Sequence, residues 1–166
     1  MNNDYSTSRL TLKKISETDA YFILELVNSA GWIEFIGDRH VHSVEDAVAY
    51  IKKIKENKNI NNWTVSLKDQ QTPIGIISFI KREYLDHHDI GFVFLPQFSK
   101  KGYAFEAANA VLQDALNNPL HTEVLASTLP HNKNSISLLL KLGFVFIKEM
   151  ELGNEKLFLF SIRKNG

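Results

Sequence analysis

The segment from Phe94 to Ala107 constrains the fold most, because an apolar strand, a basic loop with a glycine and an alanine-rich helix follow one another directly. Apolar positions after Gly102 recur at helical spacing, which is the pattern of a helix with one buried face. They are Ala104, Ala107, Ala108, Val111, Leu112, Ala115 and Leu116. Because the first of these side chains are small, we predict a helix that lies close against a sheet.

The loop before this helix has the properties of a phosphate-binding site. Ser99, Lys100, Lys101 and Gly102 include no acidic residue, and the start of a helix offers unpaired backbone N–H groups and a partial positive charge. Gly102 lets the backbone approach a ligand closely, so the loop is suited to a pyrophosphate. The alternative is an ordinary strand-to-helix turn whose lysines are solvated. The loop matches neither the triphosphate-binding nor the dinucleotide-binding glycine motif.

A second segment joins an expected strand over Val124–Thr128 to an expected helix over Ser135–Leu142. Asn132 and Ser135 lie at this junction, where a hydroxyl or an amide is able to meet a ligand. The alternative for Asn132 is that it only caps the helix, because asparagine is a preferred N-cap residue. Gly143 is a suitable residue to end the helix.

The remaining pattern predicts a single domain over residues 1–166, since no linker, repeat or low-complexity tract is visible. Apolar runs predict strands and apolar stripes predict helices. Further strands are expected at Arg9–Ile15, Trp63–Leu67, Ile74–Ile80, Ile90–Leu95, Phe144–Glu151 and Lys156–Ile162, and further helices at Ala20–Asn28 and after Ser43. We expect a short connector at Gly31–Gly37, and we expect the last two strands to form a hairpin around Gly153 and Asn154. Helices interrupt the strands, so the class is α/β, with a mixed sheet covered on both faces.

Composition argues against several kinds of partner. Nineteen basic residues balance nineteen acidic ones, which gives no electrostatic case for nucleic acid or an anionic membrane. The chain has no cysteine, and no stretch approaches the roughly 20 apolar residues of a membrane-spanning helix. The polar start over Met1–Ser8 lacks a signal core, so we expect a cytoplasmic protein. His87 and His88 are adjacent and would point to opposite faces of a strand, so we expect no metal.

Together these segments resemble the GCN5-related N-acetyltransferase (GNAT) superfamily, and within it the bacterial enzymes that acetylate the N-termini of ribosomal proteins. The family's loop Gln/Arg-x-x-Gly-x-Gly/Ala corresponds to Ser99–Ala104, with Ser99 in place of Gln or Arg and Lys100 in place of a common Gly. The branch's Asn-x-x-Ser and Lys-Leu-Gly-Phe correspond to Asn132–Ser135 and Lys141–Phe144. The resemblance implies a mixed, mostly antiparallel sheet of about six to seven strands with helices on both faces.

The resemblance also implies that acetyl-coenzyme A is the co-substrate and that a substrate amine attacks its thioester directly, without a covalent enzyme intermediate. The residues at the family's cofactor-binding positions are Phe94, Leu95, Lys100, Lys101, Gly102, Tyr103, Ala104 and Asn132. A backbone N–H around Phe94 and Leu95 would stabilise the oxyanion, and Asn132 would bind the pantetheine arm.

Three side chains are candidates for the proton transfers. Asp89 begins the segment Asp89–Phe92, which resembles the Glu-Ile-Gly-Tyr of the family's fourth strand, so it corresponds to a general base or to the anchor of a water chain. The alternative is that Asp89 only caps or solvates the start of the strand. Glu34 is the competing carboxylate, and Ser135 is the candidate for protonating the leaving thiolate.

Two functions remain open from the sequence. The first is an acetyl-coenzyme A-dependent N-acetyltransferase that acts on a primary amine of a small molecule or of a protein N-terminus. The second is a coenzyme A-binding module that does not catalyse and serves as a sensor or partner subunit. The identity of the amine and the choice between monomer and homodimer stay open. Trp32, Phe35 and Trp63 are expected in the core rather than around an acceptor.

Overall fold

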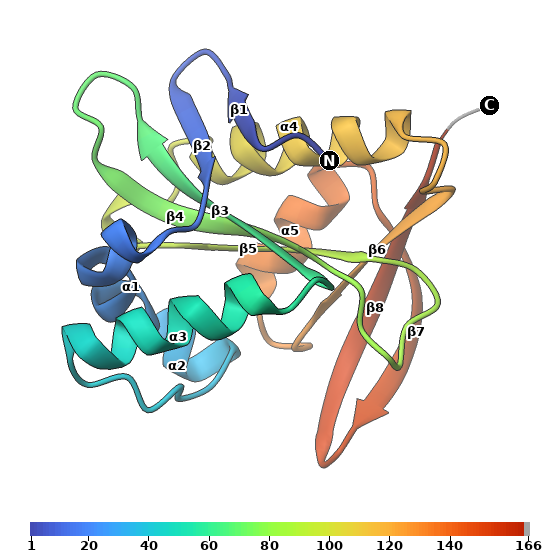
Figure 1. Cartoon of the computed structure of the whole chain (residues 1–166). Coiled ribbons are helices and arrows are strands. Elements are labelled where there is room, and N and C mark those ends of the chain that lie inside the picture. Colours follow the sequence, from blue (N-terminus) through green and yellow to red (C-terminus); the bar gives the residue numbers. More distant parts are fainter. Residues whose placement is uncertain (165–166) are drawn as a thin grey trace.

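The computed structural model describes residues 1–164 and contains a mixed sheet with helices on both faces (Figure 1). The strands are β1 (Asp4–Ser6), β2 (Leu10–Lys14), β3 (Ile60–Leu67), β4 (Pro73–Ile80), β5 (Asp89–Phe94), β6 (Glu123–Thr128), β7 (Val145–Leu152) and β8 (Glu155–Arg163). The helices are α1 (Ala20–Val27), α2 (Ala30–Phe35), α3 (Val44–Glu56), α4 (Tyr103–Asn117) and α5 (Lys133–Lys141), with short 3₁₀ helices at Glu17–Asp19 and Pro96–Phe98. The predicted α/β class is therefore confirmed.

The strands form an eight-stranded sheet in the order β1-β2-β3-β4-β5-β6-β8-β7. Neighbouring strands are antiparallel except β5 and β6, which run parallel. The strand number expected from the sequence is too low, because β1 also pairs with β2. With three residues and no apolar alternation, β1 gives no sequence signal of a strand.

The parallel strands β5 and β6 separate soon after they meet. Within residues 1–164, their ladder holds one pair, at Asp89, whereas β5 pairs with β4 along its whole length. The N–H of Leu95 donates to the carbonyl of Ile74 on β4 at 2.9 Å. Because backbone groups alternate along a strand, those of Phe92 and Phe94 point away from β4 and into the gap. The middle of the sheet thus presents backbone groups of β5 to a ligand.

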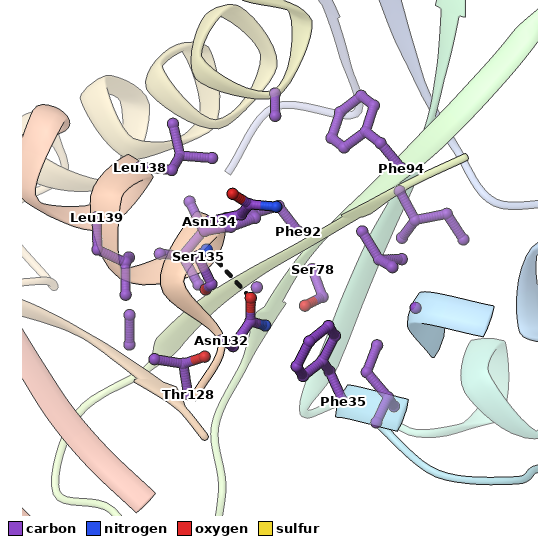
Figure 2. A pocket seen from close by; sticks show the side chains of 18 of the residues that line it. Phe35, Ser78, Phe92, Phe94, Thr128, Asn132, Asn134, Ser135, Leu138 and Leu139 are labelled. Carbon is purple, nitrogen blue, oxygen red and sulfur yellow. Dashed lines mark hydrogen bonds between the residues drawn. The ribbon is translucent and has the colours of Figure 1, made fainter. Parts of the chain in front are cut away.

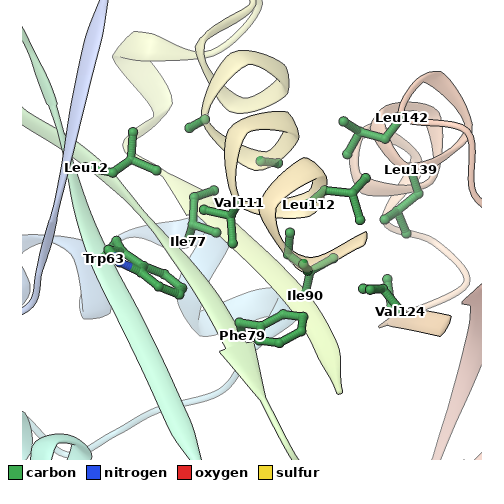
Figure 3. Close-up of a cluster of buried hydrophobic side chains, with 14 of the residues drawn as sticks. Leu12, Trp63, Ile77, Phe79, Ile90, Val111, Leu112, Val124, Leu139 and Leu142 are labelled. Carbon is green, nitrogen blue, oxygen red and sulfur yellow. The ribbon is translucent and has the colours of Figure 1, made fainter. Parts of the chain in front are cut away.

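Two apolar clusters hold the helices against the sheet. The larger one lies under α4 and α5, and the smaller one under α1, α2 and α3. Figure 3 shows Ile77 and Ile90 of the sheet against Val111 and Leu112 of α4. The alanines Ala107, Ala108 and Ala115 of α4 are fully buried, which confirms the predicted close contact between this helix and the sheet.

The connector expected at Gly31–Gly37 is wrong, because α2 occupies most of it. A helix of six residues is too short to display an apolar stripe in the sequence. The expected hairpin near the C-terminus is confirmed, since β7 and β8 pair antiparallel up to Leu152 and Glu155. Among residues 1–164, no helix has the length and apolar character to span a membrane.

Candidate active site

A cavity of about 690 Å³ opens where β5 and β6 separate. Its wall takes residues from α2, α3 and strands β3 to β5, and also from α4, α5 and the loops before them. Figure 2 shows Phe35 of α2 and Ser78 of β4 around the same space as Asn132 and Ser135 at the start of α5. A ligand in this cavity therefore contacts elements from both faces of the sheet.

The loop before α4 is held in a conformation that brings backbone N–H groups to the cavity. Gly102 is the N-cap of α4 with φ of +82°, in the left-handed region. Lys100 has φ of +60°, which is uncommon for a residue with a side chain. Lys100 thus occupies a position at which a glycine would fit without strain. Because Gly102 has no side chain to cap the helix, the first N–H groups of α4 remain available to an anion.

Contacts from the turn between β1 and β2 brace this loop. Glu106, in the first turn of α4, accepts hydrogen bonds from Arg9 N (2.8 Å), Arg9 Nε (2.7 Å) and Thr7 Oγ1 (2.6 Å). The Arg9 guanidinium also donates to the carbonyl of Lys101 at 3.0 Å and lies over the ring of Tyr103. Burial raises the pKa of Glu106, but the hydrogen bonds from Thr7 and Arg9 outweigh it and hold that pKa below its usual value. No local pattern in the sequence indicates these contacts, because they join residues about a hundred positions apart.

The structure brings most of the predicted cofactor-binding residues to this cavity. Those on its wall are Phe94, Lys100, Gly102, Tyr103, Ala104 and Asn132. Leu95 lies elsewhere: its side chain is buried in the smaller apolar cluster and its N–H is bonded to β4. The N–H of Leu95 is therefore not available as an oxyanion donor, and the N–H of Phe94 is the remaining candidate. Lys101 is also absent from the wall formed by residues 1–164, and its carbonyl accepts from Arg9.

At the start of α5, Asn132 acts as the helix cap. Its Oδ1 accepts a hydrogen bond from the N–H of Ser135 at 3.2 Å, drawn as a dashed line in Figure 2. The capping alternative is therefore correct for the side-chain oxygen. The amide nitrogen of Asn132 makes no hydrogen bond within residues 1–164, and both Asn132 and Ser135 line the cavity. The cap fixes the position of Asn132 without preventing contact with a ligand.

Asp89 is buried, with 4% of its surface exposed, and lies on the cavity wall. Arg82 Nε donates to both of its carboxylate oxygens at 3.0 Å. Burial raises the pKa of Asp89, and the charge and hydrogen bond of Arg82 offset only part of the rise. Burial excludes the solvated strand end, whereas the alternative that Asp89 caps the strand stays open. Sequence reasoning missed Arg82, although the β4–β5 hairpin, with Ile80 opposite Asp89, places the residues after β4 beside Asp89.

The competing carboxylate, Glu34, lies outside the wall of this cavity as the described residues form it. Its side chain is 58% exposed, and Oε1 lies 3.7 Å from Nε2 of His131. The ring of His131 lies 5.4 Å from that of Phe35, so α2 and the loop before α5 meet at this edge. Trp32 and Trp63 are buried as expected, but Trp32 also lines the cavity, as does Phe35, which is only partly buried.

A row of small and polar residues crosses the part of the sheet that faces α2 and α3. Asn62 of β3 pairs with Ser78 of β4, and Ser78 pairs with Gly91 of β5. A Cβ on Gly91 would lie 2.6 Å from Oγ of Ser78, so glycine leaves room for this hydroxyl. All three residues line the cavity. Sequence analysis missed them, although a serine inside the apolar strand Ile74–Ile80 was a signal.

Among residues 1–164, no group of three or more His, Cys, Asp or Glu side chains is arranged to hold a metal ion. His88 instead stacks on Phe79, with ring centroids 4.8 Å apart, and contacts His121. The cavity wall itself supplies a buried carboxylate, hydroxyls, amides and backbone N–H groups, and four cationic side chains, those of Arg39, Arg82, Lys100 and Lys141.

Comparison with known proteins gives the family. The model of the acetyltransferase (GNAT) domain matches residues 9–145. YnaD, an uncharacterized N-acetyltransferase of Bacillus subtilis (strain 168), is 31% identical over 156 residues, covering 90% of this chain and 89% of the relative. A GNAT-family acetyltransferase from Bacillus anthracis has a TM-score of 0.82 at 25% identity, covering 97% and 98% of the two chains. RimL, a ribosomal-protein α-N-acetyltransferase in complex with coenzyme A, has a TM-score of 0.81 at 14% identity, with 95% of each chain covered. The match over most of the chain shows that this protein belongs to the GNAT family of acetyltransferases.

Proposed function

We propose that this protein transfers the acetyl group of acetyl-coenzyme A to a primary amine by direct attack of the amine on the thioester. One observation supports this most: the gap between β5 and β6 and the Gly102 loop lie on the same cavity. One extended molecule therefore fits with its pyrophosphate at the loop and its thioester in the middle of the sheet. Family membership supports the acyl chemistry.

Backbone groups would hold most of the co-substrate. The N–H groups of Gly102, Tyr103 and Ala104 suit the pyrophosphate, because they begin α4 and lie beside Lys100. The backbone of Phe92 and Phe94 faces the gap and suits the amide groups of the pantetheine arm, much as an added strand would bind. The free amide nitrogen of Asn132 suits a carbonyl of that arm.

The attacking amine must first lose its proton, since amines of the lysine type have a pKa near 10.4. Asp89 suits this role, directly or through a water, because burial raises its pKa and brings it closer to that of the amine. Arg82 fixes the orientation of the carboxylate but leaves lone pairs on its oxygens free. Glu34 is less suited, because it is exposed and held by His131.

The bonds then change in a fixed order. The amine nitrogen bonds to the carbonyl carbon, and the electron pair of the carbonyl moves to its oxygen, to which the N–H of Phe94 would donate a hydrogen bond. When the carbonyl forms again, the carbon–sulfur bond breaks. The thiolate takes a proton from the hydroxyl of Ser135, which recovers one from solvent. The nitrogen loses two protons in all: Asp89 passes the first to solvent before the attack, and takes the second from the positively charged nitrogen as the amide forms.

Release of free coenzyme A thiol in the presence of a panel of amines tests this function. We expect thiol release with at least one amine, and a decrease of about 10²–10⁴-fold in Asp89→Asn, as for the loss of a general base. Ser135→Ala should also be slower. Asp69→Asn, in the exposed turn after β3, is the matched control and should keep the wild-type rate. If acetyl-coenzyme A binds but no amine releases thiol, the transferase proposal is wrong.

A further inference from the structure

We infer that the acceptor amine bears an anionic group, a carboxylate or a phosphate, and that Arg39 binds this group at the α2 side of the cavity. The inference rests on the proposed amine acetylation and specifies its substrate class. It follows from the charges on the cavity wall and from two buried polar atoms without partners.

The charged residues of the cavity wall leave a positive charge uncompensated where the acceptor would bind. Lys100 and Lys141 belong to the half built by α4 and α5, where the co-substrate would bind. Arg82 and Asp89 form an ion pair with each other. Arg39 also lines the cavity, beside the phenol of Tyr50, and takes part in no ion pair within residues 1–164.

The carboxylates that are close to Arg39 in the sequence do not neutralise its positive charge. Glu34 lies beside His131 at 3.7 Å, and Asp38 lies beside His40 at 3.4 Å. Neither residue is part of the cavity wall as residues 1–164 form it. The wall therefore contains no unpaired carboxylate that would bind a second ammonium group, so the cavity is poorly suited to a polyamine.

Unpaired buried atoms give the second observation. Among the described residues, the buried side-chain polar atoms without a hydrogen-bond partner are Trp32 Nε1 and Asn62 Oδ1. Both residues line this cavity. A buried polar atom without a partner costs stability, so its partner is expected to be a ligand or an ordered water. That both residues line one cavity points to a ligand with polar groups.

The polarity of these atoms matches an amine with an anion attached. Asn62 Oδ1 accepts hydrogen bonds and lies on the same cross-strand row as Ser78 and Gly91, beside the gap where the thioester would lie. It suits the N–H of the attacking amine. Trp32 Nε1–H donates and comes from α2, the helix that precedes Arg39. Together with the guanidinium it suits an anionic oxygen.

Thiol release from acetyl-coenzyme A tests the inference with amines matched in length. The pairs are β-alanine against propylamine and phosphoethanolamine against ethanolamine, and a diamine serves as the cationic acceptor. With rates corrected for the pKa of each amine, we expect at least one anionic acceptor to have a kcat/KM about tenfold above its neutral partner, as for a hydrogen bond to a charged group. The diamine should be no better than propylamine.

Variants locate the effect at Arg39. In Arg39→Ala the ratio between anionic and neutral acceptors should decrease to about one, and Arg39→Lys should keep part of it. Arg163→Ala removes the same charge from β8, outside the cavity wall, and should leave the ratio unchanged. Three outcomes would each overturn the inference but not the proposed function. They are equal rates for anionic and neutral amines, a preference for the diamine, and a ratio that is unchanged in Arg39→Ala. No thiol release with any amine would overturn the proposed function as well.

Discussion

Replacing Gly102 with alanine tests the role of the loop before α4. Gly102 has φ of +82°, and a Cβ there would lie 3.3 Å from Nη2 of Arg9, the residue that braces the loop. Gly153 provides a matched control in the turn between β7 and β8. It has φ of +61°, and its Cβ would meet no atom within 4 Å. Both substitutions therefore create the same kind of backbone strain, but only one of them lies at the cavity.

The expected loss of stability follows from the strain of placing a residue with a side chain in the left-handed conformation, which is about 1–2 kcal/mol. Part of this strain is offset because alanine restricts the unfolded chain more than glycine does, so each variant should lose about 1 kcal/mol of unfolding free energy. In Gly102→Ala the loop is able to relieve the strain by leaving the conformation that binds pyrophosphate. A shift of 1–2 kcal/mol in that equilibrium lowers the competent population and raises the Kd for coenzyme A about 5–30-fold.

Urea denaturation measures the stability of each variant, and titration calorimetry with coenzyme A measures the Kd. We expect similar losses of stability in both variants and weaker binding only in Gly102→Ala. If Gly102→Ala lost stability but kept the wild-type Kd, the loop would not hold the pyrophosphate. If Gly153→Ala weakened binding equally, the effect would be general destabilisation.

Three further predictions concern ionisable groups. Glu106→Gln should raise the Kd for coenzyme A in calorimetry. Because the pKa of Glu106 is lowered in the fold, its carboxylate stabilises the protein when the pH is above the usual pKa of about 4.3, and this contribution is lost as the pH falls further. The unfolding free energy of the variant should therefore depend less on pH in the acid range. The kcat/KM of the wild type should fall as pH decreases through the raised pKa of Asp89, above about 3.9, and this limb should be absent in a pH profile of Asp89→Asn. Burial lowers the pKa of His88, so its neutral form stabilises the fold and thermal stability should decrease as pH falls below about 6.5; His88→Phe, which keeps the stacking on Phe79, should weaken this dependence.

The sequence was sufficient for features that depend on local pattern. The apolar spacing after Gly102 predicted α4, and Gly102 has the positive φ that favours glycine. The C-terminal hairpin followed from two strand patterns around Gly153. Asp89 was identified from its resemblance to a family motif, and the structure places it on the cavity wall.

Other features depend on contacts between distant residues or on elements too short to show a period. The strand β1 forms only because β2 offers a partner, and α2 has too few residues for a stripe. The bond between Glu106 and Arg9 joins residues 97 positions apart. The row of Asn62, Ser78 and Gly91 exists only in the register of three paired strands. Such arrangements follow from the tertiary fold, which local propensity does not encode.

A crystal structure with bound coenzyme A tests the central claim most directly. We expect the pyrophosphate oxygens about 2.7–3.2 Å from the backbone nitrogens of Gly102, Tyr103 and Ala104, with the pantetheine arm between β5 and β6. A pyrophosphate bound away from this loop, or an arm that leaves the gap between these strands empty, would contradict the account.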